Sequence, residues 1–426
     1  SKLKKLINTG KVKRAIRLDF SAGIYFEKEF YLNTCYDAEQ LIASFWKNRL
    51  TITKMGRLFA KNIFKNLSLL PNGRSFSSLF NSVNKPILLL GAGESLDESL
   101  KYINEKSYYI IAVDAALNAL QSLSRRSDAV VGVEAQYAIQ EAYIGCQKSA
   151  NFMFADICSR PSVTKNIEAK KVWFASEYAD CRYLKAIQKL GLQESFIPPL
   201  GSVGLTALYI ALKLRKDSSI PIFVTGLDFS FSAGKTHSYF APAGKRPFYK
   251  SSRLNPYGSY DAAFSENAKS LMGKQGEKVY TNIAMLSYAE NFNALFAKVH
   301  NIFDIGKSGI PLCLQQANIE MLSYPSSENQ NACPQKQEVF FEKGKIQDYL
   351  EEERQALEQI KDLLSSGEKS SFRDKNVTLS EQLEKLLLPR DYLYLHFPDG
   401  YKFSLDPAFL RRVRAELDVF LRILGK

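Results

Sequence analysis

The stretch Ile87-Leu88-Leu89-Leu90-Gly91-Ala92-Gly93-Glu94-Ser95-Leu96 decides the fold class of this chain. Four apolar residues in a row are typical of a strand buried on both faces, and the glycines predict a turn into a helix that begins near Glu98. Helix-length segments separate most of the similar runs that follow, so the sequence predicts an α/β fold with a mostly parallel central sheet. Those further runs are Tyr109–Val113, Ala129–Val133, Phe152–Ala155, Val172–Ala175 and Ile220–Thr225.

Length and composition indicate a multidomain globular protein. The chain has 426 residues, 46% of them hydrophobic, which is more than one ordinary core accommodates. It has no run of about 18 apolar residues, and its basic start lacks the apolar block of a signal peptide. The six cysteines are widely spaced, without a CxxC pair or a Cys/His cluster, which favours reduced thiols over a metal site. We therefore expect a cytoplasmic protein without a membrane span.

Changes in composition predict four segments along the chain. Residues 1–80 are expected to form a basic domain of mixed α and β structure, and residues 81–322 a central nucleotide-binding domain. The polar residues 323–338 are interpreted as a linker, because they cannot bury enough apolar surface to order themselves. Residues 339–426 show apolar stripes at helical spacing, which predict a helical C-terminal domain.

The first segment carries most of the net charge. Residues 1–80 hold 15 Lys and Arg against 5 Asp and Glu, in a chain whose net charge is +13. An extended stretch is expected at Gly23–Tyr31, with helices at Ala38–Trp46 and Leu58–Leu70. The basic residues alternate with apolar ones and match no nucleic-acid-binding module, which favours a protein partner over nucleic acid.

The glycine loop after the first strand is the first candidate site. A strand, a glycine turn and a helix start place backbone N–H groups around a small concavity that suits a phosphate or a sugar carboxylate. Gly91, Gly93 and Ser95 would line it, and Glu94 would have to point at a ribose hydroxyl to avoid repelling a phosphate. Ordinary turn formation is the alternative interpretation.

Two acids and a second small-residue loop extend this candidate site. Asp114 and Glu134 each follow an apolar run, where an acid commonly accepts hydrogen bonds from sugar hydroxyls. Capping of the next helix is an equal alternative for Asp114. Gly201, Ser202 and Gly204 precede a strongly helical stretch and could hold a base or a phosphate, with helix packing as the competing explanation.

The most informative segment follows the last apolar run. The strand leads into Gly226-Leu227-Asp228 and then into a polar loop that carries His237, one of three histidines. An imidazole with a pKa near 6.5 could take a proton from an acceptor hydroxyl at neutral pH. Lys245 and Arg246 follow and could offset the charge of a leaving phosphate. His300 and His396 lie in helical or aromatic patterns and are interpreted as structural.

These residues resemble the motility accessory factor (Maf) family, bacterial proteins with a central domain also found in archaeal 6-hydroxymethylpterin diphosphokinases. The resemblance covers about residues 45–320, and a helix expected at Tyr280–Lys298 resembles the end of that domain. The motifs that carry it are Gly91–Leu96, Ser127-Asp128, Gly201–Gly204, Gly226-Leu227-Asp228 and Thr236-His237, with Leu58–Leu67 typical of the motility branch.

The resemblance implies a Rossmann-like sheet similar to that of bacterial sialyltransferases. It also implies transfer of a nonulosonic acid from a CMP-sugar donor to Ser or Thr of flagellin, with no cofactor required. The chain departs from the family pattern at Glu94, where proline is usual, and at Glu134, where aspartate is usual. Sialyltransferases hold the phosphate with tyrosines where this chain has Ser230 and Thr236, which shifts the expected phosphate contacts to His237 and the basic loop.

Three functions follow from these patterns. The leading hypothesis is a metal-independent inverting glycosyltransferase, with His237 and Asp228 as catalytic residues and Gly226 and Thr236 among the donor contacts. The second is an ATP-dependent diphosphokinase, in which Asp114, Glu134 and Asp228 would hold Mg²⁺. The third is a non-catalytic flagellin-binding assembly factor.

Overall fold

The computed structural model describes residues 6–7, 10, 12–254, 256, 260–318, 320, 341–369 and 377–425. The predicted linker at 323–338 lies outside the described residues. The chain divides into two compact units. Unit 1 comprises Ser1–Lys65, Glu177–Leu190 and Gly344–Lys426, and unit 2 comprises Asn66–Ser176 and Gly191–Lys343.

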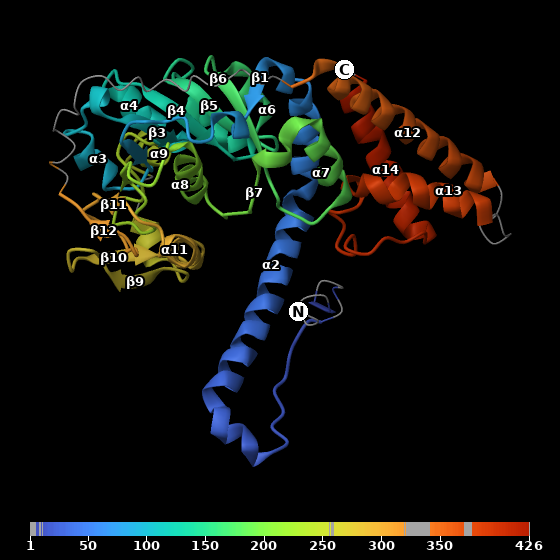
Figure 1. Ribbon diagram of the computed structural model, residues 1–426, viewed down its shortest axis with the longest axis horizontal. Coiled ribbons are helices and arrows are strands. Elements are labelled where there is room, and N and C mark those ends of the chain that lie inside the picture. The colour runs from blue at the N-terminus through green and yellow to red at the C-terminus, as the bar shows by residue number, and fades with distance from the viewer. Residues whose placement is uncertain are drawn as a thin grey trace. The chain divides into compact units, whose positions relative to one another are not determined.

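Unit 2 is built on one parallel sheet (Figure 1). Its strands are β1 (Gly73–Ser75), β2 (Ile87–Leu90), β3 (Tyr109–Val113), β4 (Ser127–Gly132), β5 (Ala150–Asp156), β6 (Lys170–Ser176), β7 (Phe196–Ile197), β8 (Ile222–Thr225), β11 (Ile302–Asp304) and β12 (Gln315–Gln316). Across the sheet the order is β1-β6-β5-β4-β3-β2-β8-β11-β12, and β7 pairs with β6. All these pairings are parallel.

The six strands predicted from apolar runs are confirmed as the centre of this sheet. They correspond to β2 through β6 and β8, and every residue of β2 and β3 is buried. Burial on both faces explains why the sequences of these strands are continuous apolar runs instead of alternating apolar and polar residues. The predicted α/β class with a mostly parallel sheet is therefore confirmed.

Short helices connect these strands. They are α3 (Leu96–Ser99), α4 (Leu117–Ser122), α5 (Gln140–Tyr143), α6 (Pro161–Asn166), α8 (Val203–Leu214), α9 (Pro242–Lys250), α10 (Tyr260–Phe264) and α11 (Ile283–Phe296), with 3-10 turns η2 (Leu70–Asn72), η3 (Phe76–Leu79), η4 (Glu105–Ser107), η5 (Asp114–Ala116), η6 (Tyr137–Ile139) and η8 (Gln193–Ser195). The almost wholly buried α8 packs against β2, β3 and β4. An antiparallel hairpin of β9 (Lys269–Met272) and β10 (Lys278–Thr281) precedes α11.

Two helix boundaries differ from expectation. The helix after the glycine loop, α3, begins at Leu96 and has only four residues. A helix so short sums few peptide dipoles, so it contributes little field to an anion. The helix expected at Tyr280–Lys298 begins only at Ile283, because Tyr280 pairs in β10 and the side chain of Asn282 caps α11 by accepting the N–H of Met285 at 2.9 Å.

The regular secondary structure of unit 1 is helical in its described residues. Its elements are η1 (Ala22–Glu27), α2 (Lys28–Leu67), α7 (Arg182–Ile187), η7 (Gln188–Leu192), α12 (Lys343–Lys369), α13 (Val377–Leu387), η10 (Leu388–Leu393) and α14 (Pro407–Leu424). The predicted helical C-terminal region is thus confirmed. At its core, the ring of Phe64 lies 4.7 Å from that of Tyr392 and 5.6 Å from that of Phe420. Edge-to-face geometry of this kind stabilises an aromatic cluster beyond area burial alone.

The start of unit 1 corrects two predictions. Gly23–Tyr31 is not extended: η1 and the first turn of α2 cover it, and Ser21 caps η1 by accepting the N–H of Gly23 at 3.1 Å. The helices expected at Ala38–Trp46 and Leu58–Leu70 are parts of one 40-residue helix that ends at Leu67. No proline lies between them to interrupt the backbone hydrogen bonds.

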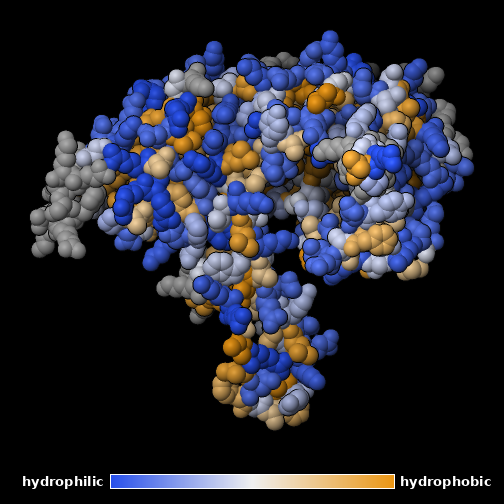
Figure 2. Space-filling model, turned by 180° about the vertical axis from the view of Figure 1, so that it is seen from behind, coloured by the Kyte–Doolittle hydropathy of each residue, from blue (hydrophilic) through white to orange (hydrophobic). Residues whose placement is uncertain are grey.

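Large apolar side chains are exposed near the N-terminal end of α2, and Figure 2 shows orange residues gathered there. Phe20 is 92% exposed, Phe26 91% and Phe30 62%. Within the part of the chain that the structure describes, no helix combines the length and apolar character needed to cross a membrane.

A buried ion pair fixes the end of β11. Nζ of Lys274 lies 2.7 Å from Oδ2 of Asp304, and the two side chains are 5% and 2% exposed. Asp304 also accepts hydrogen bonds from the N–H of Gly306 and from Nε2 of Gln316. The pair therefore ties the β9–β10 hairpin to the edge of the sheet.

We predict that Lys274→Met destabilises the protein by about 3–5 kcal/mol, because it leaves the Asp304 carboxylate buried and unpaired. Denaturant unfolding measures this change in the free energy of unfolding. Lys148→Gln is the matched control, since Lys148 forms a solvent-exposed pair with Glu168 and should change stability by less than about 1 kcal/mol. Equal effects of the two substitutions would contradict the prediction.

Candidate functional site at the carboxyl edge of the sheet

The order of the strands reverses at β2. The chain proceeds from β2 through β3, β4, β5 and β6 on one side, and then returns to place β8 on the other side of β2. In open parallel sheets, ligands bind beside the carboxyl ends of the strands at such a reversal. The loops after β2 and β8 therefore form the candidate site.

These two loops are bound together by Ser95 and Asp228. The carboxylate of Asp228 accepts the backbone N–H of Ser95 at 2.8 Å and the Ser95 hydroxyl at 2.5 Å. The same hydroxyl oxygen accepts the N–H of Gly226 at 2.9 Å. Ser95 thus acts as donor and acceptor between the loops. The side chains of Ser95 and Asp228 are both buried.

The glycines of both loops are needed for this close packing. A Cβ on Gly91 would lie 2.2 Å from the carbonyl oxygen of Gly226, and one on Gly93 would lie 2.4 Å from Oδ2 of Asp228. Gly226 itself has φ +73°, in the left-handed region that favours glycine. Contact between the loops accounts for these glycines, which the sequence had suggested as an anion-binding loop or as an ordinary turn.

Only part of the predicted phosphate cradle is available to a ligand. Gly91, Gly93 and Ser95 donate their N–H groups to Thr225, Gly226 and Asp228. The alternate N–H groups, those of Ala92 and Glu94, donate to no protein acceptor among the described residues. These two half-buried residues retain the donors that an anion could use.

The loop that carries His237 is tied to the glycine loop. The N–H of Ser238 donates to the carbonyl of Ala92 at 2.9 Å, and the carboxylate of Asp97 accepts from the Ser238 hydroxyl and from the N–H of Tyr239. Nζ of Lys235 lies 3.0 Å from Oδ2 of Asp97 and 3.6 Å from Oε1 of Glu94. The structure therefore places His237 next to the glycine loop.

The His237 ring is half-buried and neutral. Its Nδ1 lies 3.1 Å from Oγ1 of Thr236. Burial lowers the pKa of His237 below its ordinary value, because a low-dielectric environment disfavours the imidazolium ion. The imidazole is thus in its basic form at neutral pH, ready to accept a proton.

Asp228 is the better buried of the two predicted catalytic residues, with 3% of its surface exposed. Burial raises its pKa to about 6, although Lys274 and the Ser95 hydrogen bonds favour the charged form. The next residue, Phe229, has φ +48°, an uncommon conformation for a bulky residue. Because both carboxylate oxygens bind Ser95, Asp228 positions the loops in this structure.

Asp114 and Glu134 form a second acidic position at the same edge. Asp114 is 4% exposed, accepts the N–H of Ala115 at 2.7 Å and does not cap α4. Burial, with a smaller contribution from Glu134, raises its pKa to about 7. Close by, the hydroxyl of buried Tyr143 has no hydrogen-bond partner in the described structure. The carboxyl of Asp114 can thus exchange a proton near neutral pH.

The remaining predicted residues have contacts that are structural. Ser202 caps α8 by accepting the N–H of Leu205, and a Cβ on Gly204 would lie 2.5 Å from the side chain of Leu227. Gly201, with φ +85°, lies against Tyr288. Helix packing and capping, the competing explanation for this loop, are therefore sufficient to explain its small residues.

The predicted cations are partly engaged by other groups. Arg246 pairs with Glu141 at the surface. Lys245 lies over the ring of Phe240, with Nζ 5.7 Å from its centroid. Lys235, which the sequence interpretation missed, contacts the glycine loop more directly. Its position directly after Gly234 in the histidine loop was the available signal.

The acidic residues do not assemble into a metal site. No group of three or more His, Cys, Asp or Glu side chains within the described ranges is placed to hold a metal ion. The carboxylate oxygens of Asp228 accept hydrogen bonds from Ser95, and Asp228 is not grouped with Asp114 and Glu134. The predicted trio thus does not fit a bound Mg²⁺ without ligands supplied by a substrate.

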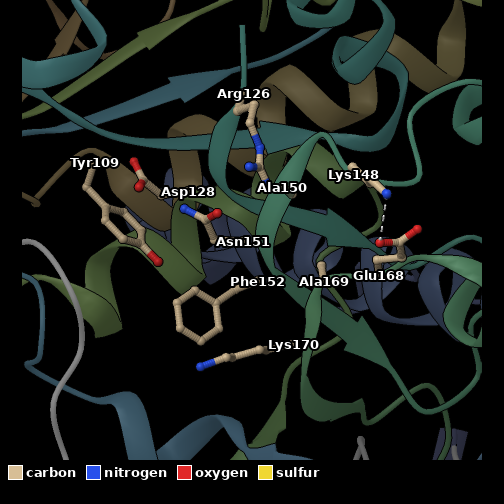
Figure 3. Close-up of a pocket in the computed structure, with 10 residues that line it drawn as sticks. All are labelled: Tyr109, Arg126, Asp128, Lys148, Ala150, Asn151, Phe152, Glu168, Ala169 and Lys170. Atoms are coloured by element: carbon tan, nitrogen blue, oxygen red, sulfur yellow. Dashed lines mark ion pairs between the residues drawn. The ribbon is translucent and has the colours of Figure 1, made fainter.

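The amino edge of the same sheet carries a cavity of about 550 Å³, shown in Figure 3. Arg126, Phe152 and Lys170 help to line it, and Lys148 forms an ion pair with Glu168 at 3.7 Å. This cavity lies at the opposite ends of the strands from the loops described above, so it is separate from the candidate site.

We predict that Asp114→Asn removes part of the pH dependence of stability. The raised pKa means that the folded protein binds this proton more tightly than the unfolded chain does, so the wild-type free energy of unfolding falls as the pH rises from about 4 to about 7. Each tenfold change in proton affinity corresponds to about 1.4 kcal/mol. The free energy of unfolding of the variant, relative to that of wild type, should therefore be up to about 4 kcal/mol higher above pH 7 than at about pH 4.

Urea unfolding at a series of pH values measures this difference. Asp217→Asn is the control, because Asp217 is exposed and its pKa is lowered by hydrogen bonds from Ser219, so its difference from wild type should have the opposite sign and be small. Parallel pH profiles for wild type and Asp114→Asn would contradict the prediction.

Comparisons with known proteins agree with these observations. The family described as "6-hydroxymethylpterin diphosphokinase MptE-like" matches residues 59–234. The chain is 32% identical, over 95% of its own length and 73% of the relative, to an "Uncharacterized protein" of Treponema pallidum (strain Nichols). The solved structure of a MAf glycosyltransferase from Magnetospirillum magneticum AMB-1 aligns with a TM-score of 0.49 and 14% identity, over 87% of this chain and 58% of that one.

The matched range contains the glycine loop and Asp228 and ends at Gly234, before Lys235 and His237. The match confirms the central domain that the motifs implied, and the Treponema relative extends the similarity across both units. Residues 59–234 therefore match the MptE-like family, and the chain as a whole belongs to the same family as the Treponema pallidum protein.

Proposed function

We propose that this protein is a glycosyltransferase that transfers a nonulosonic acid from a CMP-sugar donor to Ser or Thr of flagellin. One observation carries the proposal: a neutral histidine is held beside a glycine loop that keeps two alternate N–H donors. A nucleotide sugar brings an anionic phosphate and needs a base for the acceptor hydroxyl, and this edge of the sheet offers groups for both.

The glycine loop would bind the donor phosphate. The N–H groups of Ala92 and Glu94 are the unused donors, and the Lys235 ammonium is held beside them by Glu94 and Asp97. Backbone donors fixed by surrounding hydrogen bonds need no reorganisation as charge develops on a leaving phosphate, so they stabilise the transition state efficiently.

His237 would act as the general base. The acceptor oxygen attacks the anomeric carbon, the bond from that carbon to the phosphate oxygen breaks, and CMP leaves. The acceptor proton passes to the His237 imidazole, which burial keeps neutral and therefore able to accept it. Attack from the face opposite the phosphate inverts the anomeric configuration.

A diphosphokinase is the second candidate, and the family match favours it specifically. Asp114 and Glu134 would then hold Mg²⁺ together with the phosphate oxygens of ATP, because the protein groups by themselves do not form a complete site. Catalysis would depend on Mg²⁺ and on ATP, whereas the proposed transferase would act on a CMP-sugar without added metal.

Ligand-induced stabilisation separates these candidates. We expect CMP, tested beside ATP with Mg²⁺, GDP and UDP, to raise the melting temperature most, since a ligand at about 100 times its Kd adds about 2.7 kcal/mol to the folded state. Stabilisation by ATP with Mg²⁺ alone would favour the diphosphokinase. No stabilisation by any nucleotide would favour a non-catalytic role in binding flagellin.

A substitution at the histidine tests the assigned chemistry. His237→Ala should lower the single-turnover rate of sugar transfer by about 10²–10⁴, the usual contribution of one positioned acid–base group, while the donor Kd changes little. His300→Ala is the matched control, because His300 is exposed and lies outside the site.

A loss of donor affinity without loss of the rate at saturation would assign His237 to phosphate binding. Unchanged affinity and unchanged rate would contradict both roles.

A further inference from the structure

Unit 1 contains a cavity of about 680 Å³ that the proposed function does not use. It is enclosed by one face of α2, the segment that begins α7 and the chain from η10 to Phe403. On α2 the lining positions recur at helical spacing, with Leu41, Phe45, Asn48 and Ile52 on one side of the helix. A volume of this size is within the usual range for small-ligand sites.

A buried arginine lines this cavity without a carboxylate partner. Arg49 is 5% exposed, and its guanidinium donates to the carbonyl of Phe397 and lies 5.4 Å from the ring centroid of Tyr401. Its Nε has no hydrogen-bond partner, and burial lowers its pKa. Buried charges are normally paired, because an isolated ion loses its hydration on burial. Asp399 acts electrostatically on Arg49 but forms its ion pair with Arg412 at 2.6 Å, so no carboxylate in the described structure is in ion-pair contact with Arg49.

The other charged groups around the cavity are already matched. Lys185 forms an ion pair with Asp180 at 2.6 Å. Asp391 accepts the backbone N–H groups of Arg182 and Tyr183 at 2.7 and 3.2 Å. The exposed Arg182 side chain donates to the carbonyl of Leu388 and acts electrostatically on Asp391. Arg49 is thus the buried guanidinium of this lining, and the two carboxylates nearby would repel a doubly charged group.

The rest of the wall is aromatic. Phe45, Tyr178, Tyr394, Tyr401 and Phe403 contribute rings or ring edges. The hydroxyl of Tyr178 is buried and has no partner among the described residues, although its ring packs on Phe59 at 4.9 Å. The buried Arg49 guanidinium and the Tyr178 hydroxyl therefore lie in a wall of aromatic rings and of charged groups that have partners of their own.

We propose that this cavity is a binding site for a single carboxylate carried on an aromatic or aliphatic group. The Arg49 guanidinium pairs with the carboxylate, whose planar geometry it matches, and the aromatic wall covers the apolar part. The carboxylate comes either from a small molecule or chain end or from an acidic side chain within a peptide. The site is independent of the glycosyltransferase assignment, because its residues all belong to unit 1.

Calorimetry on the full chain with matched ligands tests the proposal. N-acetylphenylalanine should bind at least about 10-fold more tightly than its uncharged amide, the smaller end of the range for a hydrogen bond to a charged group. N-acetyl-Phe-Glu-amide, compared with N-acetyl-Phe-Gln-amide, tests the internal acidic side chain. Binding by the first acid alone assigns a free carboxylate source, and binding by the second assigns a peptide. Equal binding of acids and neutral amides, or no binding, overturns the proposal.

Variants show whether the binding occurs at this cavity. Arg49→Lys should weaken acid binding by about 10- to 100-fold, since an ammonium cannot reproduce the bidentate contact. Ser44→Trp, at an exposed position of the lining, should obstruct the cavity without disturbing the fold, which provides a second test if the buried arginine variant is unstable. Lys54→Gln is the control, an exposed charge on the same helix outside the lining. Unchanged binding in Ser44→Trp overturns the assignment.

Discussion

The carboxylate of Asp228 and the residue Ser95 form the contact on which the candidate site depends. Two hydrogen bonds from Ser95 to this carboxylate, and a third from Gly226 to the Ser95 hydroxyl, join the loops of neighbouring strands in a buried environment. In such an environment these bonds are strong, and an unmatched group there would be costly. The contact thereby fixes the backbone of the glycine loop.

Fixing that loop has a chemical consequence. When alternate N–H groups are committed to the neighbouring strand, those between them face the other way, as successive groups do in any extended segment. Ala92 and Glu94 therefore retain donors, and Ser238 binds the Ala92 carbonyl so that His237 comes to the same place. The loop that packs the sheet is also the loop that can bind an anion.

The two units carry different kinds of polar chemistry. In unit 2, burial raises the pKa of Asp114 and of Asp228, and hydrogen bonds donated to these carboxylates offset part of that rise. In unit 1, the buried Arg49 lies beside the ring of Tyr401, and its Nε has no hydrogen-bond partner in the described structure. The polar groups at the sheet edge of unit 2 and the buried Arg49 of unit 1 thus point to two different ligands.

Sequence by itself determined the sheet, because strands buried on both faces must be apolar at every position, and such runs are visible without any knowledge of contacts. It also indicated the loops after β2 and β8. It did not determine that Gly23–Tyr31 is helical, since a single side-chain cap decides that local choice. Only the tertiary structure decided what each polar group binds: Ser95 with Asp228, Lys235 with Asp97, and Arg49 with the carbonyl of Phe397. Partners distant in sequence leave no periodic pattern, so folding alone brings them together.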